Sequence, residues 1–173
     1  QLNLEILFNV INDINNVEVI IAGYGDLVDD IKQWENRSNG KIKYVGPIDY
    51  HNALKLSLDA DCLFVLRNCD LNTNKYICGS KIWESMMCAR PILVNMGTST
   101  AKKVLKEECG LVVCVDNLSD LKNKIILMRD NPELCKTLGE RGRKAYDERY
   151  CWNIMEKKLQ NLYKLLINGA DVF

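Results

Sequence analysis

Short apolar runs alternate along the chain with amphipathic stretches of helical period, and this alternation restricts the fold more than any single residue does. We expect strands at Val17–Ala22, Lys41–Val45, Cys62–Leu66, Pro91–Asn95 and Gly110–Val115. We expect helices at Leu2–Asp13, Asp26–Glu35, Tyr50–Asp59, Ala101–Glu108, Leu118–Arg129, Pro132–Tyr150 and Trp152–Leu166. Strands that alternate with helices form a mainly parallel sheet. The sequence therefore predicts the α/β class, as a mainly parallel sheet flanked by helices.

The composition excludes several classes of protein. The 173 residues make one domain of ordinary size. The formal net charge of zero argues against a nucleic-acid-binding protein, which would carry a basic stripe. No apolar run reaches the length needed to span a membrane, although a peripheral membrane contact stays open. The eight cysteines form no Cys-x-x-Cys pair and His51 is the only histidine, so we expect no metal, no cofactor and a reduced, cytoplasmic protein.

The stretch from Gly79 to Asn95 carries the clearest chemical signal. Gly79 and Ser80 indicate a helix N-terminus, where a serine oxygen can accept a hydrogen bond from a free amide. Lys81 and Glu84 are three residues apart, so they lie on one helix face. Free amides and a lysine favour an anion, and a carboxylate one turn later can accept hydrogen bonds from vicinal hydroxyls. A diphosphate beside a diol is typical of a nucleotide-sugar.

A simpler interpretation of the same helix is structural. Ile82, Trp83, Met86 and Met87 would then lie in the core, and Lys81–Glu84 would be a solvated ion pair.

The motif also resembles a known family. Ser80-Lys81-x-x-Glu84-x-Met86, followed by Ala89-x-Pro91 and an apolar strand, is similar to the donor-binding signature of GT-B glycosyltransferases, in particular retaining family 4. Ala89 stands where the family has glycine. Other pieces that resemble the family follow in the correct order: Val19–Gly25, Ile42–Gly46, Ala60–Val65, Cys109–Val113 and Tyr150–Trp152 with Tyr163.

The resemblance implies a Rossmann-like parallel sheet flanked by helices, as one half of a two-domain GT-B enzyme. Residues 1–173 would form a single C-terminal nucleotide-sugar-binding domain, without the family's first strand and N-terminal domain. The whole enzyme would transfer a sugar from a UDP or GDP donor to an acceptor hydroxyl with retention of configuration. The acceptor is not identified by this resemblance. The isolated chain is expected to be inactive.

The resemblance also assigns roles to individual residues. Glu84 would bind the ribose hydroxyls, while Gly79, Ser80 and Lys81 would face the diphosphate. Gly46 and Ile48 belong to the turn that would contact the base. Four further positions are weaker candidates for sugar or phosphate contacts: Tyr76, Arg67, Thr98 and Ser99.

Several of these residues also have ordinary interpretations. Gly23 and Gly25 are explained first by a tight turn between strand and helix, and proximity to the donor is a secondary role for them. Tyr76 stands where many relatives have a glutamate that contacts the sugar, and it could be a packed tyrosine of the expected loop Arg67–Cys78. Arg67 ends a strand and could replace cations missing upstream, or be a surface arginine.

Two alternative functions stay open. A sugar-nucleotide 2-epimerase has the same architecture, but it would need more acidic and histidine groups than this chain offers. A non-catalytic Rossmann-like or flavodoxin-like binding module is the other.

Two structural expectations follow from these interpretations. Gly23, Gly46, Arg67 and the Gly79–Glu84 segment should meet in one crevice at the carboxyl edge of the sheet. An apolar stripe on Trp152–Leu166, or the opening helix with Leu4, Leu7 and Phe8, should be exposed and favour a homodimer.

Overall fold

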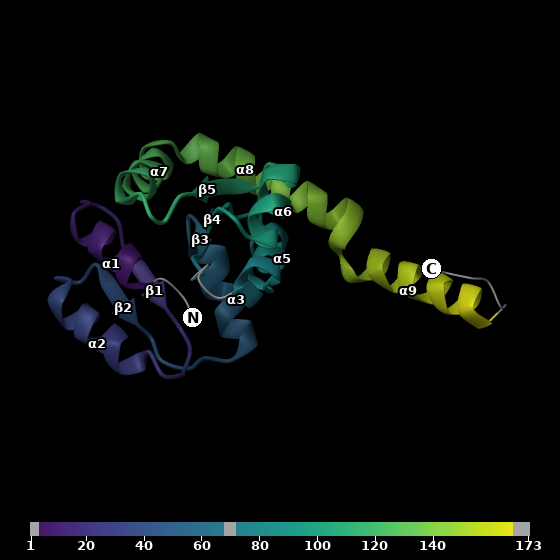
Figure 1. Cartoon of the computed structure of the whole chain (residues 1–173), viewed down its shortest axis with the longest axis horizontal. Helices are drawn as coiled ribbons and strands as arrows, with labels where there is room; N and C mark the ends of the chain where they lie inside the picture. The colour runs from purple at the N-terminus through teal and green to yellow at the C-terminus, as the bar shows by residue number, and fades with distance from the viewer. Residues whose placement is uncertain (1–3, 68–71, 168–173) are drawn as a thin grey trace.

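The computed structural model describes residues 4–67 and 72–167 and shows a rounded body from which the last helix projects (Figure 1). The elements are α1 (Leu4–Asn12), β1 (Val19–Ile21), α2 (Val28–Arg37), β2 (Ile42–Tyr44), α3 (Tyr50–Asp59), β3 (Leu63–Val65), α4 (Asn72–Tyr76), α5 (Lys81–Met87), β4 (Ile92–Asn95), α6 (Ser99–Glu107), β5 (Gly110–Val113), α7 (Leu118–Asp130), α8 (Pro132–Ala145), a π-helix (Tyr146–Tyr150) and α9 (Trp152–Ile167). All five expected strands are present, and so are the expected helices, although the one predicted at Pro132–Tyr150 is interrupted. The predicted α/β class with parallel strands flanked by helices is confirmed.

The strands form two parallel sheets where we expected one. β1 pairs with β2, and β3, β4 and β5 pair in that order. Within the described residues no ladder joins β1 to β3. One hydrophobic core nevertheless spans both sheets, since Val19 and Ile42 of the first share a cluster with Leu93 and Val113 of the second. Side-chain packing, and not strand pairing, holds the two sheets together in this part of the chain.

Helix α1 provides much of that shared core. Leu7, Phe8 and Ile11 are almost fully buried, and the helix lies against α7. The expectation that the opening helix would be exposed is therefore wrong for its described residues. Its apolar face is covered by the two sheets and α7, so it needs no outside partner.

The expected polar loop between β3 and α5 contains an additional short helix, α4. Its position is fixed by hydroxyl groups of α6. Ser99 Oγ donates to the carbonyl of Lys75 at 3.2 Å, and Thr100 Oγ1 donates to the carbonyl of Ile77 at 3.3 Å. A short polar helix has little propensity of its own, and these tertiary hydrogen bonds stabilise it here.

The helix expected from Pro132 to Tyr150 is interrupted. Pro132 starts α8 at the first helical position, as predicted, but the α-helix ends at Ala145. A π-helix follows from Tyr146 to Tyr150, and the amide of Cys151 donates to the carbonyl of Tyr146 at 2.8 Å. Such turns are rare and are frequently found at functional sites.

Helix α9 projects from the body, and none of its residues is buried (Figure 1). Its apolar side chains form a stripe at helical spacing, and they are exposed by 66% at Trp152, 43% at Leu159, 39% at Leu162, 57% at Tyr163 and 49% at Leu166. The expected exposure of this stripe is confirmed. None of the helices in the described part of the chain combines the length and apolar character needed to cross a bilayer.

We expect this exposed stripe to drive concentration-dependent dimerisation, because monomers rarely leave a contiguous apolar patch of more than about a few hundred Å² open. Light scattering over a concentration series should show the dimer. The double substitution Leu162→Lys and Leu166→Lys should abolish it, whereas Lys157→Gln on the polar side of α9 should not. A clean monomer at high concentration would contradict the expectation.

Candidate functional site

Helix α5 carries the central residue of the candidate site, Glu84. Ile82 and Met86 of the same helix are fully buried and fix its orientation on the sheet. Glu84 is only 8% exposed, and its Oε2 lies 2.5 Å from Lys81 Nζ. Lys81 is the one side-chain partner that its carboxylate has among the described residues. The predicted ion pair is present, but its acidic member is buried, so it is more than a solvated surface pair.

Ser80 does not cap α5 as we expected. Its backbone is already in the right-handed helical region, with φ −63° and ψ −27°, and its side chain makes no capping hydrogen bond. A capping serine needs an extended backbone so that its oxygen faces the next amides. The serine carbonyl instead accepts the amides of Trp83 and Glu84, at 2.9 and 3.1 Å.

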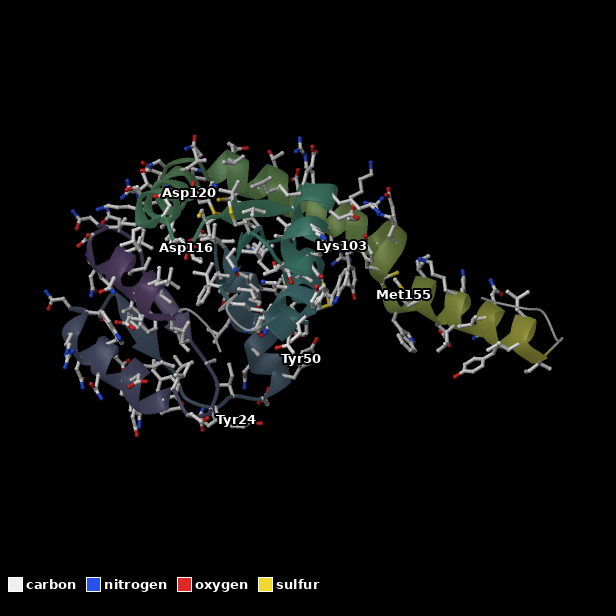
Figure 2. The ribbon with its side chains drawn as sticks, viewed as in Figure 1. Tyr24, Tyr50, Lys103, Asp116, Asp120 and Met155 are labelled. Carbon is white, nitrogen blue, oxygen red and sulfur yellow. The ribbon has the colours of Figure 1, made fainter. Side chains whose placement is uncertain are left out.

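A hollow of about 330 Å³ opens beside Glu84, between the start of α3, one flank of α5 and the π-helix. Its lining residues are Tyr50, Ser80, Trp83, Glu84, Met87 and Tyr146. Tyr50 lies beside the ribbons of α3 and α5 (Figure 2). This volume is at the lower end of the range for small-molecule sites, about 300–1,000 Å³. Aromatic walls around one carboxylate suit a ligand with a flat apolar part and hydroxyl groups.

The loops after β1 and β2 meet at the carboxyl edge of their sheet. The amide of Gly23 donates to the carbonyl of Gly46 at 2.9 Å, and Tyr44 Oη donates to the carbonyl of Gly23 at 2.7 Å. Gly23, Gly25 and Gly46 all have positive φ angles, of 142°, 139° and 74°. These backbone conformations explain the glycines as turn residues, and Ile48 follows half-buried.

Arg67 comes from the end of β3 and lies against Gly79. A Cβ atom on Gly79 would be 2.9 Å from Arg67 Nη2, so the guanidinium occupies the space that the glycine leaves. Asn95 fixes the backbone of Arg67 from β4, because its Oδ1 accepts the Arg67 amide at 2.8 Å. The cation is thereby held beside the turn that leads into α5.

The remaining candidates are placed differently. Thr98 is buried and caps α6, since its Oγ1 accepts the amide of Ala101 at 3.0 Å and donates to the carbonyl of Asn95 at 3.1 Å. Its hydroxyl is fully used within the fold, which does not support a sugar contact. Ser99 is used in positioning α4. Tyr76, at the end of α4, is highly exposed, so it is not the packed loop tyrosine that was one of its two expected roles.

The structure thus brings four of the predicted residues together in two pairs and places Glu84 beside Tyr50, which was not predicted. Gly23 contacts Gly46, Arg67 contacts Gly79, and the hollow joins Glu84 to Tyr50, four residues after Gly46.

Sequence reasoning missed the aromatic walls of the hollow, Tyr50, Trp83 and Tyr146, and the neighbouring Met87. The spacing of Ser80, Trp83, Glu84 and Met87 at i, i+3, i+4 and i+7 marks a single helix face and could have indicated it.

This arrangement places the chain among open α/β proteins whose ligand sites lie beyond the carboxyl ends of parallel strands. The family is more specific. A family model described as "Glycosyl transferases group 1" matches residues 3–145, and the chain belongs to that family.

Similar proteins agree with this assignment. The chain is 27% identical over 168 residues to an uncharacterised glycosyltransferase, MJ1178, of Methanocaldococcus jannaschii, covering 96% of this chain and 45% of that protein. Sucrose-phosphate synthase of Thermosynechococcus elongatus superposes with a TM-score of 0.80 at 21% identity, over 96% of this chain and 43% of that one. HepE of Anabaena, in complex with UDP, gives 0.75 at 17% identity, over 94% and 45%.

The chain spans less than half the length of the curated relatives it matches and less than half of the two solved chains named above. The resemblance seen in the sequence is confirmed as to family and fold, and the fold corresponds to one half of a GT-B glycosyltransferase.

Proposed function

We propose that this chain is the C-terminal, nucleotide-sugar-binding domain of a glycosyltransferase, formed by residues 1–173 as one unit. The observation that carries the proposal is the buried carboxylate of Glu84 in the wall of an aromatic hollow. A ribose in the hollow would donate hydroxyl hydrogen bonds to that carboxylate, which is charged and therefore a strong acceptor. The flat base would lie against the aromatic side chains and the turn at Gly46 and Ile48, with Gly23 and Gly25 adjacent.

Ligand binding at this site would replace the Lys81–Glu84 ion pair with contacts from each residue to the ligand. Lys81 Nζ lies 2.5 Å from the buried carboxylate of Glu84 and balances its charge. A nucleoside diphosphate can supply partners for both groups at once. Its hydroxyls would take over Glu84, and its phosphates would take over Lys81, whose side chain is half exposed. A ligand with only one of these two parts would leave a charge of the pair without a partner, so binding favours the complete nucleotide.

Positive charge at the start of α5 would assist the reaction. Arg67 beside Gly79, Lys81, and the backbone amides of Gly79–Lys81 lie where a diphosphate would follow the ribose. Departure of the nucleoside diphosphate leaves negative charge, and donors fixed in advance stabilise that charge in the transition state. Because α5 has only seven residues, the two side-chain cations contribute more than its dipole does.

The sugar would pass to an acceptor hydroxyl with retention of configuration, as the family resemblance implies. Structures similar to this chain carry UDP or UDP-glucose, which supports a nucleotide-sugar donor. The acceptor and any residue on its side would belong to the rest of the enzyme, so the chain alone would bind the donor without turning it over.

Titration of the chain with UDP, GDP and NAD by calorimetry tests the proposal. We expect UDP or GDP to bind and NAD not to bind, because NAD carries a second, bulkier nucleoside on its diphosphate where a nucleotide-sugar carries a single sugar. Preference for NAD would instead support a non-catalytic dinucleotide-binding module. Incubation with a UDP-sugar should leave the sugar unchanged, whereas conversion to its 2-epimer would identify an epimerase.

A further inference from the structure

A second cluster of interacting side chains lies outside the hollow, where α6 meets the end of the π-helix. Glu107, in the last turn of α6, is 7% exposed and accepts hydrogen bonds from Tyr150 Oη and from the guanidinium of Arg149. Lys103 Nζ donates to Tyr150 Oη at 3.1 Å and lies 4.7 Å from the centre of its ring. Figure 2 labels Lys103, which lies on α6 at this cluster. The tyrosine hydroxyl thus joins a cation to a buried anion.

The charge of Glu107 is stabilised by its neighbours. Burial raises the pKa of this carboxyl, but the hydrogen bonds from Tyr150 and Arg149 outweigh burial and leave the pKa below its ordinary value. A buried carboxylate with satisfied hydrogen bonds holds its partners in one geometry, because each lost contact leaves an unpaired charge.

The ring of Tyr150 connects this cluster to the hollow. Its centre lies 4.8 Å from that of Trp83, and the two planes are inclined at 45°. Trp83 directly precedes Glu84 on α5 and forms one wall of the hollow. Tyr146, at the other end of the same π-helix, forms another wall. The positions of two aromatic walls, Trp83 and Tyr146, therefore depend on the position of the π-helix.

We infer that Tyr150 and Glu107 are positioning residues for the hollow beside Glu84. They hold Trp83 and the π-helix with Tyr146, and so they set the width of the space in which a base and ribose would lie. The inference rests on the proposed function for the identity of the ligand, but the position of Trp83 can be measured without any ligand.

The experiment compares graded substitutions in the chain. Tyr150→Phe removes the hydroxyl alone, Tyr150→Leu also removes the ring, and Tyr163→Phe on the exposed α9 serves as the matched control. Calorimetry measures the Kd of UDP and GDP. Acrylamide quenching measures the accessibility of Trp83 in a background carrying Trp34→Phe and Trp152→Phe. Circular dichroism checks that each variant folds.

We expect Tyr150→Leu to raise the nucleotide Kd about tenfold and Tyr150→Phe about threefold, in the range found for residues that act on a site from a distance. Trp83 should become more accessible to acrylamide in the same order, and Tyr163→Phe should change neither quantity. Glu107→Gln should change the Kd in the same direction as Tyr150→Phe, and the effect of the double variant should be smaller than the sum of the two, because both weaken the same Tyr150–Glu107 contact.

Unchanged Kd values and unchanged quenching in folded Tyr150 variants would overturn the inference. If the unsubstituted chain binds neither UDP nor GDP, the proposed function fails, and quenching of Trp83 alone then decides whether Tyr150 positions the wall.

Discussion

Replacing Glu84 with glutamine is expected to weaken UDP or GDP binding by roughly tenfold or more. A hydrogen bond from a hydroxyl to a charged carboxylate contributes about 1.5–3 kcal/mol. The amide oxygen of glutamine can still accept that bond, but it carries no charge, so the charge-assisted part of the bond is lost. The change in Kd measured by calorimetry gives this loss directly, since each ~1.4 kcal/mol is a factor of ten.

Free pyrophosphate supplies the control for this substitution. It reaches only the cations, and Glu84→Gln releases Lys81 from its 2.5 Å ion pair. Pyrophosphate affinity should therefore stay the same or rise. The unsubstituted chain should also prefer UDP over 2′-deoxy-UDP, and the variant should lose that preference. Equal affinity of both proteins for UDP would leave Glu84 a structural member of an ion pair.

The substitution Gly139→Ala is expected to destabilise the fold, although alanine favours helices by about 1 kcal/mol over glycine. Gly139 lies in α8 where it presses on the end of α5, and an added Cβ would be 2.1 Å from the carbonyl oxygen of Ala89. A backbone atom cannot move aside as a flexible side chain can. Overpacking of this kind costs about 1–3 kcal/mol or more and should outweigh the gain in propensity.

Thermal unfolding followed by circular dichroism measures the effect. An overpacking cost of about 3 kcal/mol less about 1 kcal/mol of helix propensity leaves a net loss of about 2 kcal/mol. We therefore expect the Tm to fall by about 4–8 °C, since ~1 kcal/mol corresponds to about 2–4 °C in a domain of this size. Lys136→Ala, on the exposed side of the same helix, should change the Tm by little, within about 0.5 kcal/mol. An unchanged or higher Tm for Gly139→Ala would show that α5 and α8 are not in close contact at this point.

Ala89 itself shows what sequence comparison could anticipate. It stands where the family has glycine, and its φ angle of 53° is the left-handed conformation that glycine adopts without strain. The order of strands and helices was equally readable, because the alternation of apolar runs with helical stretches is a local property. The choice of Glu84 as the central candidate residue followed from its spacing to Lys81 and from the motif around it.

Features that depend on distant contacts could not be predicted from the sequence. Helix α4 is held by hydroxyls of Ser99 and Thr100, more than twenty residues later. The bond between Tyr150 and Glu107, which accompanies the π-helix, joins residues 43 positions apart. The hollow itself exists only because α3, α5 and the π-helix converge. The periodicity of hydrophobic residues is a local pattern and cannot show which elements converge in space. For the same reason it did not predict that the strands would separate into two sheets.

The projecting α9 turns small angular changes at its base into large displacements. Its 16 residues extend about 24 Å at about 1.5 Å per residue, so it acts as a lever. A rotation of about 10° at Cys151 would move the far end of a helix of this length by about 4 Å. The tyrosine clamped next to this pivot also touches the wall of the hollow. Tyr150 therefore lies between the wall of the hollow and the base of α9, and its ring contacts the first of these directly.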